Sequence, residues 1–228
     1  MSVAENIEKL KQQIGNGVTL VAVSKTKPAA LILEAYNAGQ RDFGENYIQE
    51  LTEKYAQLPK DIQWHMIGHV QTNKVKYIAP FVHLVHGVDS LKLLKEINKQ
   101  AEKNNRVIQC LLQVHIAQEE TKFGFDPAEI LDLIKGEEWK TLKNVWIKGL
   151  MTMGSNTDDM KQLEQEFLKV KHLFDEFCNY IPASPGGPSA MPVLSMGMSG
   201  DFALAIKCGS NMIRVGSLLF GERNYSPK

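Results

Sequence analysis

Apolar residues recur along this chain in two patterns, short unbroken runs and stripes spaced three or four residues apart. The runs predict strands that are buried on both faces, and the stripes predict amphipathic helices. A first helix is predicted over residues 2–14, where Ser2 and Glu5 have the spacing of a capping box. Strands are predicted at 18–25, 42–47, 64–68, 82–88, 107–116, 146–153, 193–199 and 212–220.

Helical segments separate these strands, mostly through short connections. Such alternation favours a parallel sheet with right-handed crossovers, and eight repeats at about this length favour a closed barrel over an open sheet. We therefore expect an α/β fold, a single (β/α)8 TIM barrel with an extra N-terminal helix. No composition shift divides residues 1–228 into two domains, and the stretch 182–192, rich in proline and glycine, is predicted to be an irregular loop.

Charge and cysteine content exclude several classes of protein. Basic and acidic residues number 26 each, so no overall field attracts nucleic acid or anionic lipid. No segment approaches the ~18 consecutive apolar residues of a membrane span, and the N-terminus has no apolar signal core. Cys110, Cys178 and Cys208 lie far apart in apolar segments, which is typical of a reducing compartment. We expect a cytoplasmic protein without disulfides or a zinc site.

The apolar run over residues 18–24 leads directly into Lys25, and Thr26-Lys27-Pro28 then turns the chain. A lysine at the carboxyl end of a buried strand has two interpretations. It is either a solvated strand terminus or a partly desolvated amine that attacks a carbonyl to form a Schiff base. Its neighbours decide between them, because function in such barrels lies at the carboxyl ends of the strands. Those ends carry Lys25, Asn46, His69, Asp89, His115, Met151, Thr152, Ser199, Gly216 and Ser217.

Arg214 lies within an apolar strand, where a guanidinium must find an acceptor. A structural salt bridge and a contact with a ligand are both open interpretations. Small-residue turns at 196–200 and 215–217 follow the last two strands, where such barrels commonly hold a phosphate. The pairs His65 and His69, or His83 and His86, lie on no metal-binding motif, so we expect core or rim histidines and no metal.

Several short motifs run in order over nearly the whole chain. They are VAVSKTKP at 21–28, FGENY at 43–47, WHMIGHVQTNK at 64–74, TKFG at 121–124, GLMT at 149–152, LSMGMS at 194–199 and IRVGS at 213–217. Together these motifs closely resemble the pyridoxal phosphate homeostasis protein family. The resemblance implies a barrel like the N-terminal domain of alanine racemase, with pyridoxal 5′-phosphate as its cofactor.

By position, the resemblance makes Lys25 the Schiff-base lysine and Arg214 the partner of the pyridine nitrogen. Ser217 stands where threonine is commoner, which keeps the hydroxyl, and His115 replaces a frequent asparagine. The resemblance further assigns the phosphate to Ser199, Gly216 and Ser217, and the edge of the ring to Asn46 and Met151.

The resemblance implies a carrier or regulator in intracellular pyridoxal phosphate homeostasis, not an enzyme, with apo-enzymes that depend on the cofactor as its partners. An amino-acid racemase is the first alternative, and a cofactor-free, aldolase-like barrel is the second. Racemisation needs a second base, which alanine racemases take from a C-terminal domain of a partner subunit. This sequence stops at Lys228, soon after the last predicted strand, so we expect no such domain and a monomer.

Overall fold

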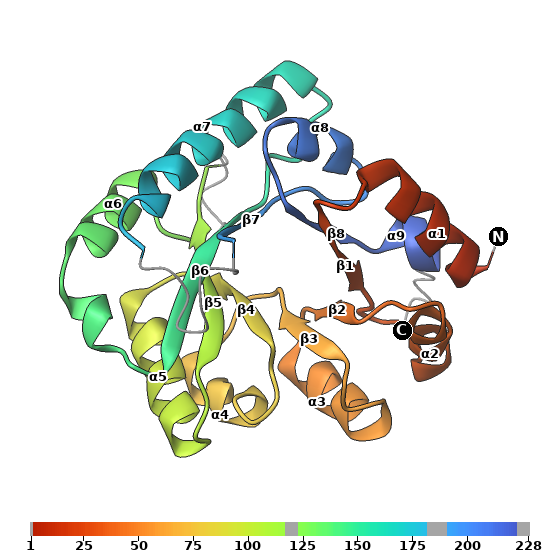
Figure 1. Cartoon of the computed structure of the whole chain (residues 1–228), viewed down its shortest axis with the longest axis horizontal. Coiled ribbons are helices and arrows are strands. Elements are labelled where there is room, and N and C mark those ends of the chain that lie inside the picture. The colour runs from red at the N-terminus through yellow and green to blue at the C-terminus, as the bar shows by residue number, and fades with distance from the viewer. Residues whose placement is uncertain (1, 117–122, 182–190, 223–228) are drawn as a thin grey trace, which may run out of the picture.

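The computed structural model describes residues 2–116, 123–181 and 191–222. Parallel strands pair in sequence order and the last pairs with the first, so the sheet closes into a barrel ringed by helices (Figure 1). This arrangement confirms the predicted (β/α)8 barrel. The strands are β1 Thr19–Val23, β2 Asp42–Glu45, β3 Gln63–Met66, β4 Leu84–Val88, β5 Ile108–Val114, β6 Val145–Thr152, β7 Val193–Ser195 and β8 Met212–Val215.

The helices begin where the sequence offers caps. In the extra N-terminal helix, α1, the Ser2 hydroxyl accepts from the backbone of Glu5, whose carboxylate accepts from the backbone of Ser2. Asp126 and Glu129 form the same capping box at α6. The helices are α1 Val3–Ile14, α2 Ala29–Asn37, α3 Ile48–Gln57, α4 Val75–Ile78, α5 Leu91–Lys103, α6 Pro127–Lys135, α7 Met160–Cys178, α8 Phe202–Lys207 and α9 Ser217–Phe220, with 3-10 turns at Thr72–Lys74 and Glu138–Thr141.

The predicted end of the last strand is wrong. Strand β8 ends at Val215, and Ser217–Phe220 forms the short helix α9. A short apolar run does not distinguish a strand from a buried turn of helix. The burial of Phe220 is compatible with both. The seventh strand also ends early, at Ser195. Residues 182–190 of the predicted loop lie outside the described residues.

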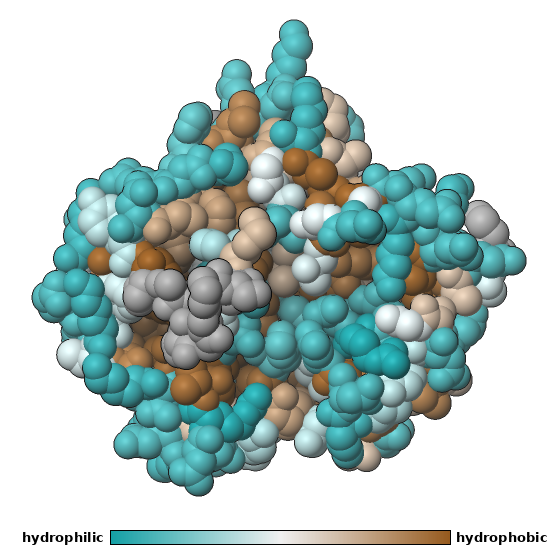
Figure 2. Space-filling model, viewed as in Figure 1, coloured by the Kyte–Doolittle hydropathy of each residue, from teal (hydrophilic) through white to brown (hydrophobic). Residues whose placement is uncertain are grey.

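Two apolar layers hold the barrel together. The larger layer lies between the helices and the outer wall of the sheet, and it includes Phe43, Trp64 and Phe167. Hydrophilic residues cover the helices around the margin of the face in Figure 2, as this packing requires. The smaller layer fills the inside of the barrel, and it consists of Val21, Leu84, Leu111, Met151, Val193 and Met212.

None of the helices that the structure describes is both long and apolar enough to cross a membrane. The strand order instead places the carboxyl ends of all eight strands at one end of the barrel. The residues that follow these ends are distant in sequence, and the closure of the sheet makes them neighbours.

Candidate functional site

A cavity of about 470 Å³ opens at the carboxyl ends of the strands, and Lys25 lines it directly after β1. All but one of the residues predicted for the site line this cavity. Segments that follow β1, β2, β7 and β8 supply most of them, so closure of the barrel is what assembles the group. They are Lys25, Asn46, Ser199, Arg214, Gly216 and Ser217.

Met151 is the exception. Its side chain is fully buried inside the barrel, where it packs with Val21 and Leu111, and Met153 lines the cavity in its place. Met153 directly follows the last residue of β6 and lies two positions after Met151, so in extended chain the two side chains point to the same side. Met153 is therefore one layer closer to the open end than Met151. His115 is absent from the residues that line the cavity.

A buried ion cluster fixes the backbone before Lys25. The ammonium group of Lys54, on α3, donates to the backbone oxygen of Ser24 at 2.7 Å, to Glu45 at 2.8 Å and to Glu50 at 2.6 Å. The Ser24 hydroxyl donates to the same oxygen of Glu45 at 2.5 Å. We call Ser24, Glu45, Glu50 and Lys54 the Lys54 cluster. No local sequence pattern indicates this cluster, because Ser24 and Lys54 are 30 positions apart.

Burial raises the pKa of the Glu45 carboxyl, and the Lys54 ammonium and the Ser24 hydroxyl act in the opposite direction. The second carboxylate oxygen of Glu45 is buried without a hydrogen-bond partner among the described residues. Glu45 is thus costly to bury. The ammonium group of Lys54 stabilises the negative charge of this carboxylate.

The residue after Lys25 is held in an unusual conformation. Thr26 has φ of 65°, in the left-handed region that β-branched residues rarely adopt. Its backbone N–H donates to Glu50 at 2.6 Å, so the Lys54 cluster also fixes this turn. The ammonium group of Lys27 donates to the backbone oxygen of Phe220, the last residue of α9, at 3.0 Å and to those of the next two residues. Lys25 is therefore held from both sides by long-range contacts.

A glycine directly after β8 lets the backbone there approach the end of β1 closely. A Cβ atom on Gly216 would lie 3.1 Å from the backbone oxygen of Val23, which is tighter than most such contacts. The backbone N–H of Gly216 donates to the Ser199 hydroxyl at 3.3 Å. Together with the neighbouring Ser217, these groups form a polar wall of the cavity beside Lys25.

Arg214 is 4% exposed and lines the cavity. One of its terminal nitrogens donates to the backbone oxygen and hydroxyl of Ser195, at 2.9 and 2.8 Å. The other donates to the backbone oxygen of Thr152 at 2.8 Å. These bonds use three of the five N–H groups of a guanidinium. Within the described residues Arg214 forms no ion pair within 4.0 Å, which disfavours the interpretation as a structural salt bridge.

Burial lowers the pKa of Arg214 to about 10, and the carboxylate of Asp201 partly offsets this effect. The guanidinium is therefore charged at neutral pH. Its cavity-facing edge is a hydrogen-bond donor without acceptor capacity.

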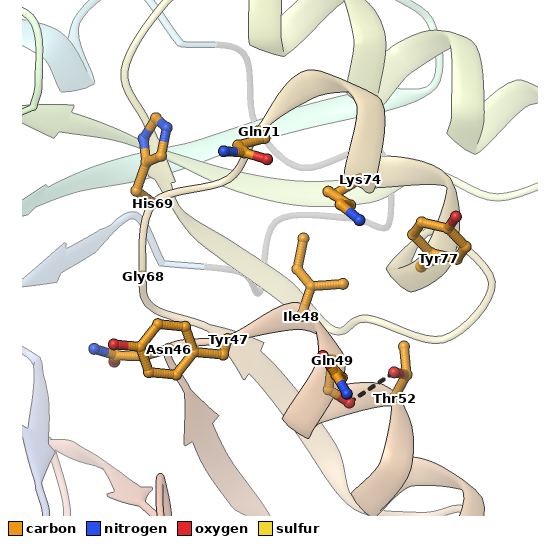
Figure 3. A pocket seen from close by; sticks show the side chains of 10 residues that line it. All are labelled: Asn46, Tyr47, Ile48, Gln49, Thr52, Gly68, His69, Gln71, Lys74 and Tyr77. Atoms are coloured by element: carbon orange, nitrogen blue, oxygen red, sulfur yellow. Dashed lines mark hydrogen bonds between the residues drawn. The ribbon is translucent and has the colours of Figure 1, made fainter. Parts of the chain in front are cut away.

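A second, wider cleft of about 850 Å³ adjoins the Lys25 cavity (Figure 3). Tyr47 lies on one side of it and Tyr77 on the other, with the Lys74 side chain between them in the view of Figure 3. Both spaces are lined by Asn46, Gly68 and His69, so they are continuous. The wider cleft lacks both the strand-end lysine and the arginine. The smaller cavity, which both of these residues line, is therefore the candidate site.

His69 and Asp89 form a pair at the border of the two spaces. The His69 ring nitrogen Nδ1 lies 2.9 Å from the Asp89 carboxylate, and the ring stacks on Phe123 with centroids 4.1 Å apart. Both residues were predicted at strand ends, but their pairing was not predicted. A carboxylate beside a histidine is an arrangement suited to proton transfer.

Three side chains at the opposite end of the barrel have atoms suited to a metal ion. Ligand atoms of Asp42, His65 and His83 all lie within 4.8 Å of one another. Burial, His65 and the cations Lys148 and Arg106 all lower the pKa of His83, to about 4. Nearby cations also oppose a bound dication, so we do not propose a metal here.

The chain is similar in sequence to known proteins over nearly its whole length. Residues 1–224 match the family model described as the N-terminal domain of alanine racemase. The pyridoxal phosphate homeostasis protein of Aquifex aeolicus is 41% identical over 227 residues, covering 98% of this chain and 96% of that protein. That of Pasteurella multocida is 37% identical over 239 residues, covering 99% of this chain and all of that protein.

Solved structures agree with the sequence matches. PipY of Synechococcus elongatus, 35% identical, has a TM-score of 0.88 without PLP and 0.86 with PLP bound, and covers 96% of this chain and 100% of its own. Alanine racemase from Bartonella henselae is only 18% identical, with a TM-score of 0.71 over 97% of this chain and 60% of that one, so it shares the fold alone. By sequence identity over nearly its full length, the chain belongs to the pyridoxal phosphate homeostasis protein family.

Proposed function

We propose that this protein binds pyridoxal 5′-phosphate in the Lys25 cavity and acts in intracellular homeostasis of the cofactor. One observation carries the proposal: an amine, a guanidinium with spare donors and two hydroxyls line a single cavity of about 470 Å³. The homologous PipY was solved with PLP bound, which supports the same ligand for this chain.

The residues present match the groups of this cofactor. The cofactor supplies an aldehyde, with which a lysine amine condenses with loss of water. Lys25 provides the amine, and the Lys54 cluster holds the backbone on both sides of it. Ser199 and Ser217, together with Gly216, would bind the phosphate through hydroxyls and backbone N–H groups. Asn46 would border the ring.

Arg214 supports a carrier or regulator over an efficient enzyme. An arginine that faces the ring nitrogen only donates, so this nitrogen must remain an unprotonated acceptor. A protonated ring nitrogen would withdraw electrons more strongly. The protein is thus suited to holding the cofactor, and we propose that it acts without efficient turnover.

An amino-acid racemase is the second candidate, and the His69–Asp89 pair is the observation that favours it. His69 lines the Lys25 cavity, so it offers a second base in addition to the lysine. General acid–base catalysis contributes about 10²–10⁴-fold, too little for rapid turnover by itself.

The balanced charge, 26 basic and 26 acidic residues, supports a small-molecule ligand and apo-enzyme partners over nucleic acid or a membrane surface. We further propose that the chain acts as one barrel, as a monomer in the cytoplasm. Sedimentation at several concentrations, with and without the cofactor, tests the monomer.

The proposal is tested by loading the protein with pyridoxal phosphate, reducing it with borohydride and locating the adduct by mass spectrometry. We expect the adduct on Lys25. Lys27, which also lines the cavity, is the internal control. A stoichiometric adduct on Lys27 or on any other lysine would contradict the assignment.

Incubation with L-alanine and a panel of other amino acids in deuterium oxide separates the two candidates. A carrier gives no enzymatic exchange at the α-carbon and no racemisation. Turnover at about 1 s⁻¹ or faster would show an enzyme. In that case His69→Gln should abolish racemisation but retain exchange on the face that Lys25 serves, because only the second base is removed.

A further inference from the structure

A continuous series of hydrogen bonds runs through the barrel from the cavity to its opposite end. Arg214 donates to the Ser195 hydroxyl at 2.8 Å, and this hydroxyl lies 3.2 Å from Nδ1 of His86. Nε2 of His86 lies 2.9 Å from Nδ1 of His65. Nε2 of His65 lies 3.0 Å from a carboxylate oxygen of Asp42. We call these five residues the histidine chain.

The histidine chain is almost entirely shielded from water. Ser195, His86 and His65 have no exposed surface, and Arg214 is 4% exposed. Only Asp42, at the amino end of β2, reaches solvent, with 25% of its side chain exposed. A buried polar group that loses its partner retains the full cost of desolvation. Each member therefore depends on the next one for its orientation.

The chemistry of the two ends sets the direction of every bond. A carboxylate only accepts, so Nε2 of His65 carries the hydrogen and Nδ1 accepts from His86. His86 then donates through Nε2 and accepts at Nδ1 from the Ser195 hydroxyl. The oxygen of Ser195 is left to accept from Arg214. All donors are thus matched to acceptors, with both histidines neutral.

Burial supports the neutral form of His86. It lowers the pKa of His86 well below the ordinary value, and the charged guanidinium of Arg214 and any proton on His65 or His83 act in the same direction. A charged imidazole would have to donate through both nitrogens. That would place two donors, Arg214 and His86, on the Ser195 oxygen.

We propose that Ser195, His86 and His65 are positioning residues for Arg214, and that Asp42 sets the direction in which they donate. This inference rests on the proposed function, because it concerns the face that Arg214 presents to the cofactor. The histidine chain anchors one terminal nitrogen of the Arg214 guanidinium. The spare N–H groups of the guanidinium are left for the cavity. A carboxylate at the far end of the barrel thereby influences the ring environment of the cofactor.

The test compares absorbance spectra and binding titrations of pyridoxal phosphate in the full-length protein and its variants. Ser195→Ala removes the hydroxyl between Arg214 and His86, and Ser195→Thr retains one. We expect Ser195→Ala to shift the absorbance maximum and to weaken binding on the order of tenfold, as for a lost hydrogen bond to a charged group. Ser195→Thr should restore both.

Asp42→Asn tests the far end without disturbing the core, because this side chain is partly exposed. An amide both donates and accepts, so the direction of the chain is no longer fixed. We expect a spectral shift in the same direction as in Ser195→Ala, with a smaller loss of affinity.

His83→Gln is the matched control. The His83 ring lies beside His65, with centroids 5.4 Å apart, but it is not a member of the histidine chain. This variant should bind with the wild-type spectrum and affinity.

Two outcomes would overturn the inference. One is a wild-type spectrum in folded Asp42→Asn, and the other is equal behaviour of Ser195→Ala and Ser195→Thr. Failure of the proposed function is distinguishable, because the wild-type protein would then give no borohydride adduct on Lys25. An adduct on Lys25 together with unchanged spectra in the variants would refute the histidine chain alone.

Discussion

Two buried polar groups differ in form and in what they hold. The Lys54 cluster is compact and charged: one ammonium group contacts the carboxylates of Glu45 and Glu50 and a backbone oxygen. The histidine chain is linear, its central members are neutral, and charge is found only at its ends, Arg214 and Asp42. The cluster fixes the backbone on either side of Lys25, whereas the histidine chain orients a side chain.

The difference follows from where each group lies. The cluster joins α3 to the ends of β1 and β2, so a few short contacts bridge neighbouring elements. The histidine chain must cross the inside of the barrel, where inward side chains from alternate strands stack in layers. A charge in the middle of that path would be costly to desolvate. Neutral imidazoles carry hydrogen bonds across it without that cost.

The largest expected effect is on the cluster. Lys54→Met leaves the buried carboxylate of Glu45 without its ammonium partner, and we expect a loss of about 3–5 kcal/mol in the free energy of unfolding. Urea denaturation measures this change. Lys171→Met, which breaks an exposed pair with Asp175, should cost less than about 1 kcal/mol.

Adding Glu45→Gln to Lys54→Met removes the charge that the first substitution leaves unpaired. The double variant should regain part of the lost stability. If the two losses simply add, the cluster does not act as a charged unit and the contrast with the histidine chain fails.

The next largest effect concerns the inner end of the histidine chain. Arg214→Lys keeps the charge, but one ammonium group does not reproduce the fork that reaches Ser195 and Thr152 together. We expect a loss of about 1–3 kcal/mol in the free energy of unfolding. Arg41→Lys, at an exposed pair, is the control and should change it by less than about 1 kcal/mol. Equal stabilities of the two variants would contradict the prediction.

Acid should destabilise the folded protein through protonation of His83, which lies next to the outer end of the histidine chain. Its pKa is about 4 in the folded protein, below the ordinary 6.5, so the unfolded chain binds the proton more readily. The stability that this group contributes is full above about pH 6.5 and is lost as pH falls towards 4. We expect the free energy of unfolding to fall by about 1–3 kcal/mol over that range. This figure is reduced because His83 is only partly buried.

Urea denaturation at the two ends of this pH range measures the loss. His83→Gln should reduce it, and His172→Gln, which replaces an exposed histidine on α7, should not. The same acid sensitivity in wild type and His83→Gln would show that another group is responsible.

The smallest expected effect is at Thr26. Asparagine tolerates positive φ better than a β-branched residue, as Asn105 with φ of 52° illustrates. Thr26→Asn should therefore raise the free energy of unfolding by about 0.5–1 kcal/mol, since the backbone bond to Glu50 is retained. A decrease in the melting temperature would show that the threonine side chain has a role of its own.

Local patterns in the sequence determined the order of the elements and the place of Lys25 at the end of the first strand. An apolar run that ends in Lys25, and the capping box of Ser2 and Glu5, are signals that neighbouring residues carry by themselves. The resemblance to a family supplied the residues of the site, and the cavity contains all of these except Met151. The resemblance placed Met151 at the edge of the ring, but position in the sequence does not give the depth of a side chain within the barrel.

Only the tertiary structure decided which polar residues meet. Ser195 and His86 are 109 positions apart, and Lys54 reaches Ser24 across 30 positions. No local pattern encodes such contacts, because they arise when the sheet closes and places inward side chains of distant strands at the same height. Burial then makes each contact obligatory, since an unpaired polar group in the interior costs more than the bond contributes. The sequence thus determined the barrel and its lysine, and closure of the barrel decided what holds Lys25 and Arg214 in place.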